Sequence, residues 1–176
     1  MMGKFAKIAA TAVAGLAAAA VLAQGAPAAP TVAGVPVGTG AGVHSSNSPF
    51  APLQERADVV PWSVLTDVKT KVEKNRILPV FPANVLALNQ KSQRVQGFMM
   101  PLEPGEKQKH FLISSVPLTC SFCVPGGPES MVEVKTKNPV KYTLEAVVVE
   151  GQFQVLKDDP YGLYYRVQDA VAVNGK

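Results

Sequence analysis

The chain is poor in the residues on which most enzyme sites depend. Its 176 residues include only two cysteines, two histidines and one tryptophan. His44 lies in a Ser/Asn-rich stretch and His110 stands alone, so no Ser-His-Asp arrangement is indicated. Gly126-Gly127 lacks the length and the lysine of a phosphate-binding loop. These shortages argue against a hydrolase and leave a single Cys-x-x-Cys motif to carry chemistry.

The chain also lacks a strong excess of charge of either sign. The formal net charge is +4, and it falls to +2 without Lys4 and Lys7. Nucleic-acid binding requires a clustered basic face, and here the aromatic residues are not interleaved with a basic stripe. The sequence therefore predicts no nucleic-acid partner.

Only one long hydrophobic run is present, from Ile8 to Ala23, and it follows Lys4 and Lys7. Small residues end the run, which is the three-part pattern of a secretory signal. The run has about 16 residues, short of the ~20 that span a bilayer, and no cysteine follows it for lipid attachment. We expect residues 1–28 to be a signal peptide cleaved somewhere within 23–28. The sequence therefore predicts a periplasmic protein whose mature chain has no membrane span.

Residues 29–58 are rich in Pro, Ala, Gly and Ser and have no sustained periodicity. Such a composition buries too little apolar area to offset the chain entropy lost on ordering. The sequence predicts a flexible linker here, followed by a single β domain over residues 59–176.

Patterned sequence begins near Trp62. Apolar residues at helical spacing predict a short helix near 62–70, with Trp62 packing it on the domain. Residues 77–81 read as extended, and a second short helix is predicted over 82–88. Strands are then predicted over 93–102, 110–116, 131–135, 141–156 (broken near 150–151), 163–167 and 171–173.

This pattern predicts a mostly β fold with a small α contribution. A flat sheet of five or six strands would expose long edges, and closure into a small OB-like barrel removes them. One or two short helices would lie on its N-terminal side. A β-sandwich is the alternative.

Cys120 and Cys123 are compatible with three kinds of chemistry. In an oxidising compartment the pair can form a disulfide, although the loop it closes is too small to add much chain-entropy stabilisation. A thiol–disulfide oxidoreductase places its first cysteine at a helix N-terminus. Here residues 125–128, Pro-Gly-Gly-Pro, prevent a helix from starting at the motif, and no basic residue is close in sequence.

The third hypothesis is a metal site, because two thiolates from one tight turn supply half of a tetrahedral ligand set. Candidates for the remaining ligands are His110, Met99, Met100 and Glu129. Methionine and cysteine favour copper as Cu(I), whereas histidine favours zinc. Adjacent strand residues point to opposite faces, so Met99 and Met100 cannot both reach one ion without a bulge.

Three segments also carry a family resemblance: Gln-Gly-Phe-Met-Met-Pro-Leu-Glu at 96–103, His-Phe-Leu-Ile at 110–113, and Cys-Ser-Phe-Cys at 120–123 followed by Gly-Gly-Pro. Together they resemble domain of unknown function family 3299, an uncharacterised family of exported bacterial proteins, over roughly Trp62 to Ala170. The resemblance implies an envelope location, a small β domain and an association with envelope transport or metal homeostasis. It implies no activity and no residue role.

The leading hypothesis is a non-enzymatic periplasmic binding or accessory protein. Its Cys120/Cys123 loop would bind a soft metal (copper or zinc) or contact a partner in envelope transport or metal homeostasis. A thiol-disulfide oxidoreductase and a structural protein-interaction module are the alternatives.

Overall fold

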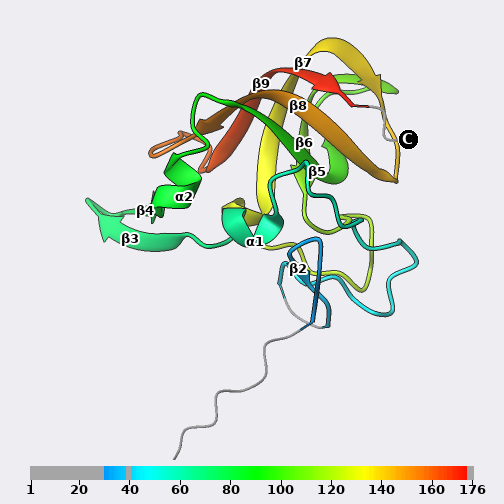
Figure 1. Cartoon of the computed structure of the whole chain (residues 1–176), viewed down its shortest axis with the longest axis horizontal. Helices are drawn as coiled ribbons and strands as arrows, with labels where there is room; N and C mark the ends of the chain where they lie inside the picture. The colour runs from blue at the N-terminus through cyan, green and yellow to red at the C-terminus, as the bar shows by residue number, and fades with distance from the viewer. Residues whose placement is uncertain (1–29, 39–40, 174–176) are drawn as a thin grey trace, which may run out of the picture.

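A closed five-stranded barrel forms the centre of the computed structural model, which describes residues 30–38 and 41–173 (Figure 1). The strand order around the barrel is β5-β6-β7-β9-β8, with β8 returning to β5. Neighbouring strands are antiparallel except for β7 and β9, which are parallel. This Greek-key barrel confirms the predicted mostly β fold. The bounds are β5 (Ser92–Pro101), β6 (Lys107–Ser114), β7 (Met131–Lys141), β8 (Ala146–Val155) and β9 (Tyr165–Ala172).

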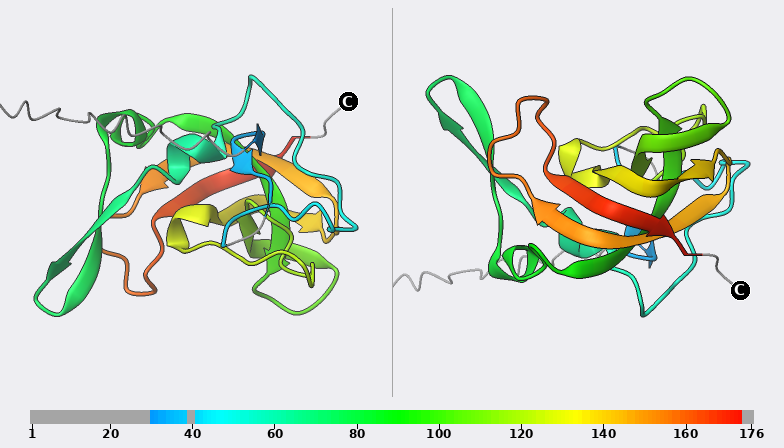
Figure 2. Two further views of the ribbon diagram at one scale, coloured as in Figure 1. Left: turned by 90° about the horizontal axis from the view of Figure 1, so that it is seen from below. Right: turned by 90° about the horizontal axis from the view of Figure 1, so that it is seen from above.

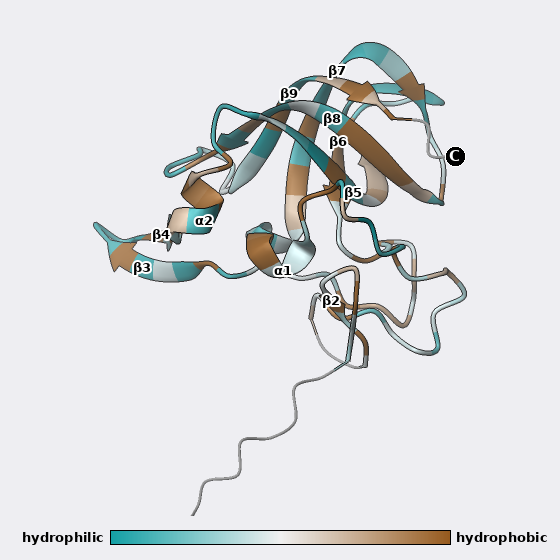
Figure 3. Ribbon diagram, viewed as in Figure 1, coloured by the Kyte–Doolittle hydropathy of each residue, from teal (hydrophilic) through white to brown (hydrophobic). Residues whose placement is uncertain are grey.

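The core fills the barrel because alternate residues of each strand point inward. Val95 of β5 and Val149 of β8 are register partners and are both fully buried. Hydropathy bands along the strands follow the same alternation, and the first half of β8 is apolar throughout (Figure 3). Other fully buried side chains of the strands are Phe111, Ile113, Val132, Val134, Phe153, Tyr165 and Val167.

Two glycines allow the strands to approach closely as the barrel coils. A Cβ atom at Gly97 would lie 2.7 Å from the carbonyl oxygen of Ser114, and one at Gly151 would lie 2.6 Å from that of Gln168. Next to Gly151, the pairing of β8 with β9 shifts register between Glu150 and Gln152. The break expected near 150–151 is therefore a register shift within one continuous strand.

The helices are short and lie on one side of the barrel (Figure 1). They are α1 (Trp62–Leu65), α2 (Ala83–Leu86) and the 3-10 helix η1 (Pro128–Ser130). Trp62 is 2% exposed and its Nε1 donates to the carbonyl oxygen of Gln96 at 2.8 Å, which confirms its anchoring role. The hydroxyl of Tyr165 donates to the carbonyl oxygen of Leu65 at 2.6 Å and holds the other end of α1. In the described part of the chain, every helix is too short to cross a membrane.

The prediction of a helix extending to residue 70 is wrong. After α1 the chain forms a hairpin of β3 (Lys69–Glu73) and β4 (Arg76–Val80), which projects from the barrel as an arm (Figure 2). Lys74 and Asn75 both have positive φ, as a two-residue hairpin turn requires. The helical spacing of Val68 and Val72 misled the prediction, because the Val72 side chain is 78% exposed rather than packed on a core.

The boundary between the third and fourth barrel strands also differs from the prediction. β7 continues through Pro139 to Lys141, and the chain then turns before β8 begins at Ala146. Pro139 is tolerated because the β6–β7 pairing shifts register between Gln108 and His110, where a ladder hydrogen bond is not required.

Residues 30–38 and 41–58 were expected to form a flexible linker. In the structure they are packed on the rest of the domain. This segment contains a short hairpin of β1 (Thr31–Val32) and β2 (Val35–Pro36). Val35 and Leu53 are 3% and 2% exposed, so a few apolar side chains suffice to anchor a segment of low overall hydrophobicity. The predicted signal peptide, residues 1–28, lies outside the described residues.

Candidate functional site

The cysteine motif lies in the loop of residues 115–130 that connects β6 to β7, here called the disulfide loop. Cys120 and Cys123 are joined by a disulfide, with their Cα atoms 5.3 Å apart. Two tight turns form the loop: the amide of Cys120 donates to the carbonyl oxygen of Pro117, and that of Cys123 to the carbonyl oxygen of Cys120, both at 3.2 Å. Pro125 and the two glycines that follow prevent a helix at the motif, as predicted.

Burial within the disulfide loop is uneven. Cys120 and Cys123 are 5% and 7% exposed, whereas Phe122 and Val124 are 59% and 53% exposed. The covalent link is thus on the inside of the loop, whereas the apolar side chains of Phe122 and Val124 face solvent.

The N-terminal segment holds the disulfide loop from one side. The amide of Gly42 donates to the carbonyl oxygen of Val124 at 2.8 Å, and Ser48 Oγ lies 3.4 Å from Cys120 Sγ. Gly126 lies at this contact: a Cβ atom there would be 3.2 Å from Cα of Gly42, and 2.6 Å from Cβ of Ser130 within the loop itself. The segment expected to be a linker is therefore part of the site.

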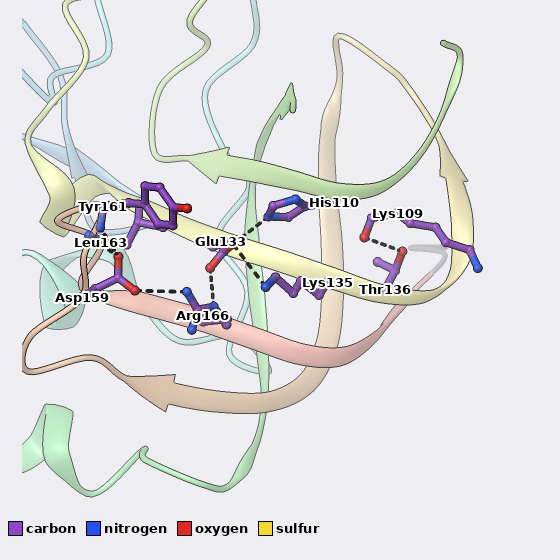
Figure 4. Close-up of polar contacts among 9 residues, drawn as sticks. All are labelled: Lys109, His110, Glu133, Lys135, Thr136, Asp159, Tyr161, Leu163 and Arg166. Atoms are coloured by element: carbon purple, nitrogen blue, oxygen red, sulfur yellow. Dashed lines mark hydrogen bonds and ion pairs between the residues drawn. The ribbon is translucent and has the colours of Figure 1, made fainter. Parts of the chain in front are cut away.

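A second polar cluster joins three barrel strands to the turn between β8 and β9 (Figure 4). His110 Nε2 lies 2.6 Å from Glu133 Oε1, and Arg166 Nε donates to the other carboxylate oxygen. Arg166 Nη2 also donates to Asp159 Oδ2 at 3.2 Å, and Lys135 Nζ lies 3.7 Å from Glu133. These five residues are called the Glu133 network.

The carboxylate of Glu133 is buried, and hydrogen bonds and positive charges around it offset the cost of that burial. Burial raises its pKa, and the hydrogen bonds from Arg166 and His110 and the charge of Lys135 lower it by more, so the pKa lies below its usual value. Glu133 is therefore held ionised by its partners. A carboxylate with both oxygens occupied in this way serves as a structural connector rather than as a proton donor.

The residues predicted to complete a metal site have separate surroundings. His110 contacts Glu133, and Glu129 Oε1 accepts a hydrogen bond from the amide of Gly127 at 3.0 Å. Met99 is buried in the core, whereas Met100 is half-buried. Within residues 30–38 and 41–173, no group of three or more His, Cys, Asp or Glu side chains is placed to hold a metal ion. Copper or zinc binding stays a prediction, and it would require the disulfide to be reduced.

Sequence reasoning did not single out Glu133 or Arg166. A charged residue between two valines in a strand indicates a solvent-exposed face, and Glu133 is instead 5% exposed beneath its partners. In the strand it alternates with the fully buried Val132 and Val134, so it lies on the outer face of the barrel.

Together, the fold and the disulfide loop define a small β-barrel protein with a covalently closed loop. The chain belongs to the family described as protein of unknown function (DUF3299), whose sequence model matches residues 55–163. This range includes the disulfide loop and barrel strands β5 to β8.

The crystal structure of a DUF3299 family protein from Pseudomonas aeruginosa PAO1 is similar at 22% identity, with a TM-score of 0.46, covering 72% of this chain and 99% of that one. No curated protein matches the chain.

Proposed function

We propose that this is an exported accessory protein of the bacterial cell envelope that binds a partner protein through the disulfide loop, with Phe122 at the centre of the contact. The observation that carries the proposal is the position of Phe122. It is an exposed aromatic residue between two buried, covalently linked cysteines.

An exposed aromatic side chain on a constrained loop is well suited to recognition. Aromatic residues are enriched among the residues that contribute most to protein interfaces. A loop that is already closed loses less conformational entropy on binding than a free one. The disulfide and the hydrogen bond from Gly42 to Val124 both restrain the loop before any partner arrives.

The burial of the sulfur-bearing residues favours this role over thiol–disulfide exchange. Exchange requires an attacking thiolate to reach a disulfide sulfur, and Cys120 and Cys123 are each less than one-tenth exposed. Metal binding through the pair would require both thiolates to be free of the disulfide. A structural clip needs neither change.

Photo-crosslinking from position 122 in envelope extracts of the producing cells tests the proposal. A photoreactive phenylalanine analogue replaces Phe122 in one full-length variant and Tyr161 in a matched control. Tyr161 is 86% exposed in the turn between β8 and β9. We expect one discrete adduct from position 122, removed by excess purified wild-type protein but not by excess Phe122→Ser. Equal adducts from both positions, or equal competition by both proteins, would contradict the proposal.

Export is tested by the mass of the protein recovered from the periplasmic fraction. We expect a mature chain that begins within residues 24–29, after loss of the signal peptide. A chain that retains Met1 and stays in the cytoplasmic fraction would contradict an envelope role.

A further inference from the structure

The β3–β4 arm carries the most exposed aliphatic side chains of the described residues. It projects from one side of the barrel, and within the described chain its two strands pair only with each other (Figures 1 and 2). Val72 and Ile77 are register partners and are 78% and 70% exposed. Contact between these two side chains leaves most of their surface in water. An apolar patch with polar residues around it marks a protein or membrane interaction site.

The register divides the arm into two unlike faces, because side chains of a strand alternate between its two sides. Thr70 and Pro79 lie on the same face as Val72 and Ile77, so this face has no charge. The opposite face is charged and consists of Lys69, Lys71, Glu73, Arg76, Leu78 and Val80. The arm is therefore an amphipathic hairpin whose apolar face is not covered by the barrel.

The charge of the arm is positive. It has one acidic side chain and four basic ones, Lys69, Lys71, Lys74 and Arg76. Lys71 Nζ lies 2.7 Å from Glu73, and Arg76 is paired with Asp158 of the neighbouring turn. The other two lysines form no ion pair with any described residue. The arm thus complements a negatively charged surface, to which each nearby lysine adds attraction.

The edges of the arm are poorly suited to the addition of another strand. β3 carries Lys69 and Lys71, and β4 contains Pro79, which has no N–H to donate. Lysine and proline in exposed strands are means by which proteins prevent edge pairing. Strand addition by a peptide or a second copy of the chain is therefore disfavoured. A lipid surface would contact the uncharged face and needs no free edge.

We propose that the β3–β4 arm lies on the surface of an anionic phospholipid bilayer. Its uncharged face enters the interface, where Val72 and Ile77 contact the acyl chains. Lys69 and Lys74 stay at the level of the phosphates, because their long stems reach back toward water. The arm does not cross the bilayer, since the unpaired backbone groups along its edges need water. This contact is separate from the one proposed for Phe122.

Cosedimentation with vesicles tests the proposal. The chain from residue 29 onward is used, because it keeps every described residue and leaves out the apolar run Ile8–Ala23, which would bind lipid by itself. The vesicles are phosphatidylcholine alone, or phosphatidylcholine with about one-third phosphatidylglycerol. We expect roughly ten-fold tighter binding to the anionic vesicles in about 0.1 M salt, and loss of this difference in about 1 M salt.

Two arm variants separate the apolar and the charged contributions. Val72→Thr/Ile77→Thr keeps branched residues suited to a strand, and we expect it to weaken binding by at least about ten-fold. Lys69→Gln/Lys74→Gln should lose about ten-fold in binding to anionic vesicles and should bind neutral vesicles as the wild type does.

The matched control changes two exposed aliphatic side chains outside the arm. Leu144 lies in the turn between β7 and β8, and Val171 lies near the end of β9; they are 51% and 43% exposed. Leu144→Thr/Val171→Thr should bind like the wild type. Fluorescence gives the depth: Val72→Trp should be quenched by phosphatidylglycerol brominated on its acyl chains, and Leu144→Trp should not. Trp62 is buried and gives the same background in both.

The proposal is overturned by equal binding to neutral and anionic vesicles, by equal losses in the arm variants and the control, or by equal quenching at positions 72 and 144. Absence of vesicle binding overturns it as well. If the protein instead forms dimers in analytical ultracentrifugation that Val72→Thr/Ile77→Thr dissociates, the arm binds a second copy of the chain and not a bilayer.

Discussion

Two loops leave the barrel and are held in place by different forces. The disulfide loop is closed by a covalent bond between buried cysteines and exposes apolar residues. The turn of residues 156–164, between β8 and β9, is closed by polar contacts. There Asp159 accepts hydrogen bonds from the amide of Tyr161 at 2.9 Å and from the side chain of Arg166. Arg166 also donates a hydrogen bond to Glu133.

The difference means that the two loops should respond to different conditions. The turn of residues 156–164 depends on charges, so acid and salt act on it. The disulfide loop depends on a redox bond and on apolar packing, so a reductant acts on it. The proposed contact surface at Phe122 should therefore respond to a reductant and stay independent of pH.

The largest effect should come from breaking the Glu133 network. Glu133→Gln leaves Arg166 and its neighbours without their buried carboxylate, and we expect a loss of about 3 kcal/mol in the free energy of unfolding. Urea denaturation measures this loss. Glu145→Gln, an exposed carboxylate, is the control and should change stability by less than about 0.5 kcal/mol. Equal effects of the two substitutions would show that the network is not structural.

Removal of the disulfide should have a smaller and more local effect. For Cys120→Ala/Cys123→Ala we expect a loss of at most about 2 kcal/mol, because the closed loop is short. Hydrogen exchange should become faster in the disulfide loop and in residues 41–48, which contact it, and should stay unchanged in the barrel. Faster exchange throughout β5 to β9 would contradict a local clip.

Acid should weaken the protein through Glu133. Its folded-state pKa is lower than its usual value, so the unfolded chain binds the proton more readily and acid favours unfolding. The resulting stability is fully present above about pH 4.5 and is lost as the pH falls through the lower folded-state value. Urea midpoints between pH 7 and pH 3 should fall less steeply in Glu133→Gln than in the wild type. Identical pH profiles of the wild type and Glu133→Gln would show that Glu133 is not the source of the acid sensitivity.

The smallest effect should come from the exposed ion pair that links the β3–β4 arm to the turn of residues 156–164. Arg76 Nη1 donates to Asp158 Oδ2 at 2.8 Å, and both side chains are about half exposed. Asp158→Asn should cost no more than about 1 kcal/mol, and the cost should vanish in 1 M salt. A salt-independent loss as large as that of Glu133→Gln would contradict this ranking.

The barrel could be predicted because its strands carry a strong periodic signal. Five or six predicted strands joined by short loops, together with the cost of exposed sheet edges, predict a small closed barrel. The packing of Trp62 on the domain could be predicted because it is the single tryptophan and lies at the start of a patterned region. The family resemblance pointed to the same part of the chain.

The parts that sequence reasoning missed have weak or misleading local signals. The Lys74-Asn75 turn lacks the Asn-Gly or Asp-Gly pattern that marks most tight hairpins. The N-terminal segment is held by a few contacts, such as those of Val35 and Leu53, which periodicity does not detect. Glu133 is paired with Arg166, a residue distant in sequence, so only the assembled fold shows that its carboxylate is buried.

The state of the cysteines in the protein produced by cells tests the account most directly. Protein recovered from the periplasmic fraction is treated with an alkylating agent in denaturant, with and without prior reduction, and the mass of each sample is measured. We predict no modification without the reductant and two modifications, at Cys120 and Cys123, after reduction. A protein modified at both cysteines without reduction would contradict a covalent clip and would favour free thiols or a metal-thiolate site.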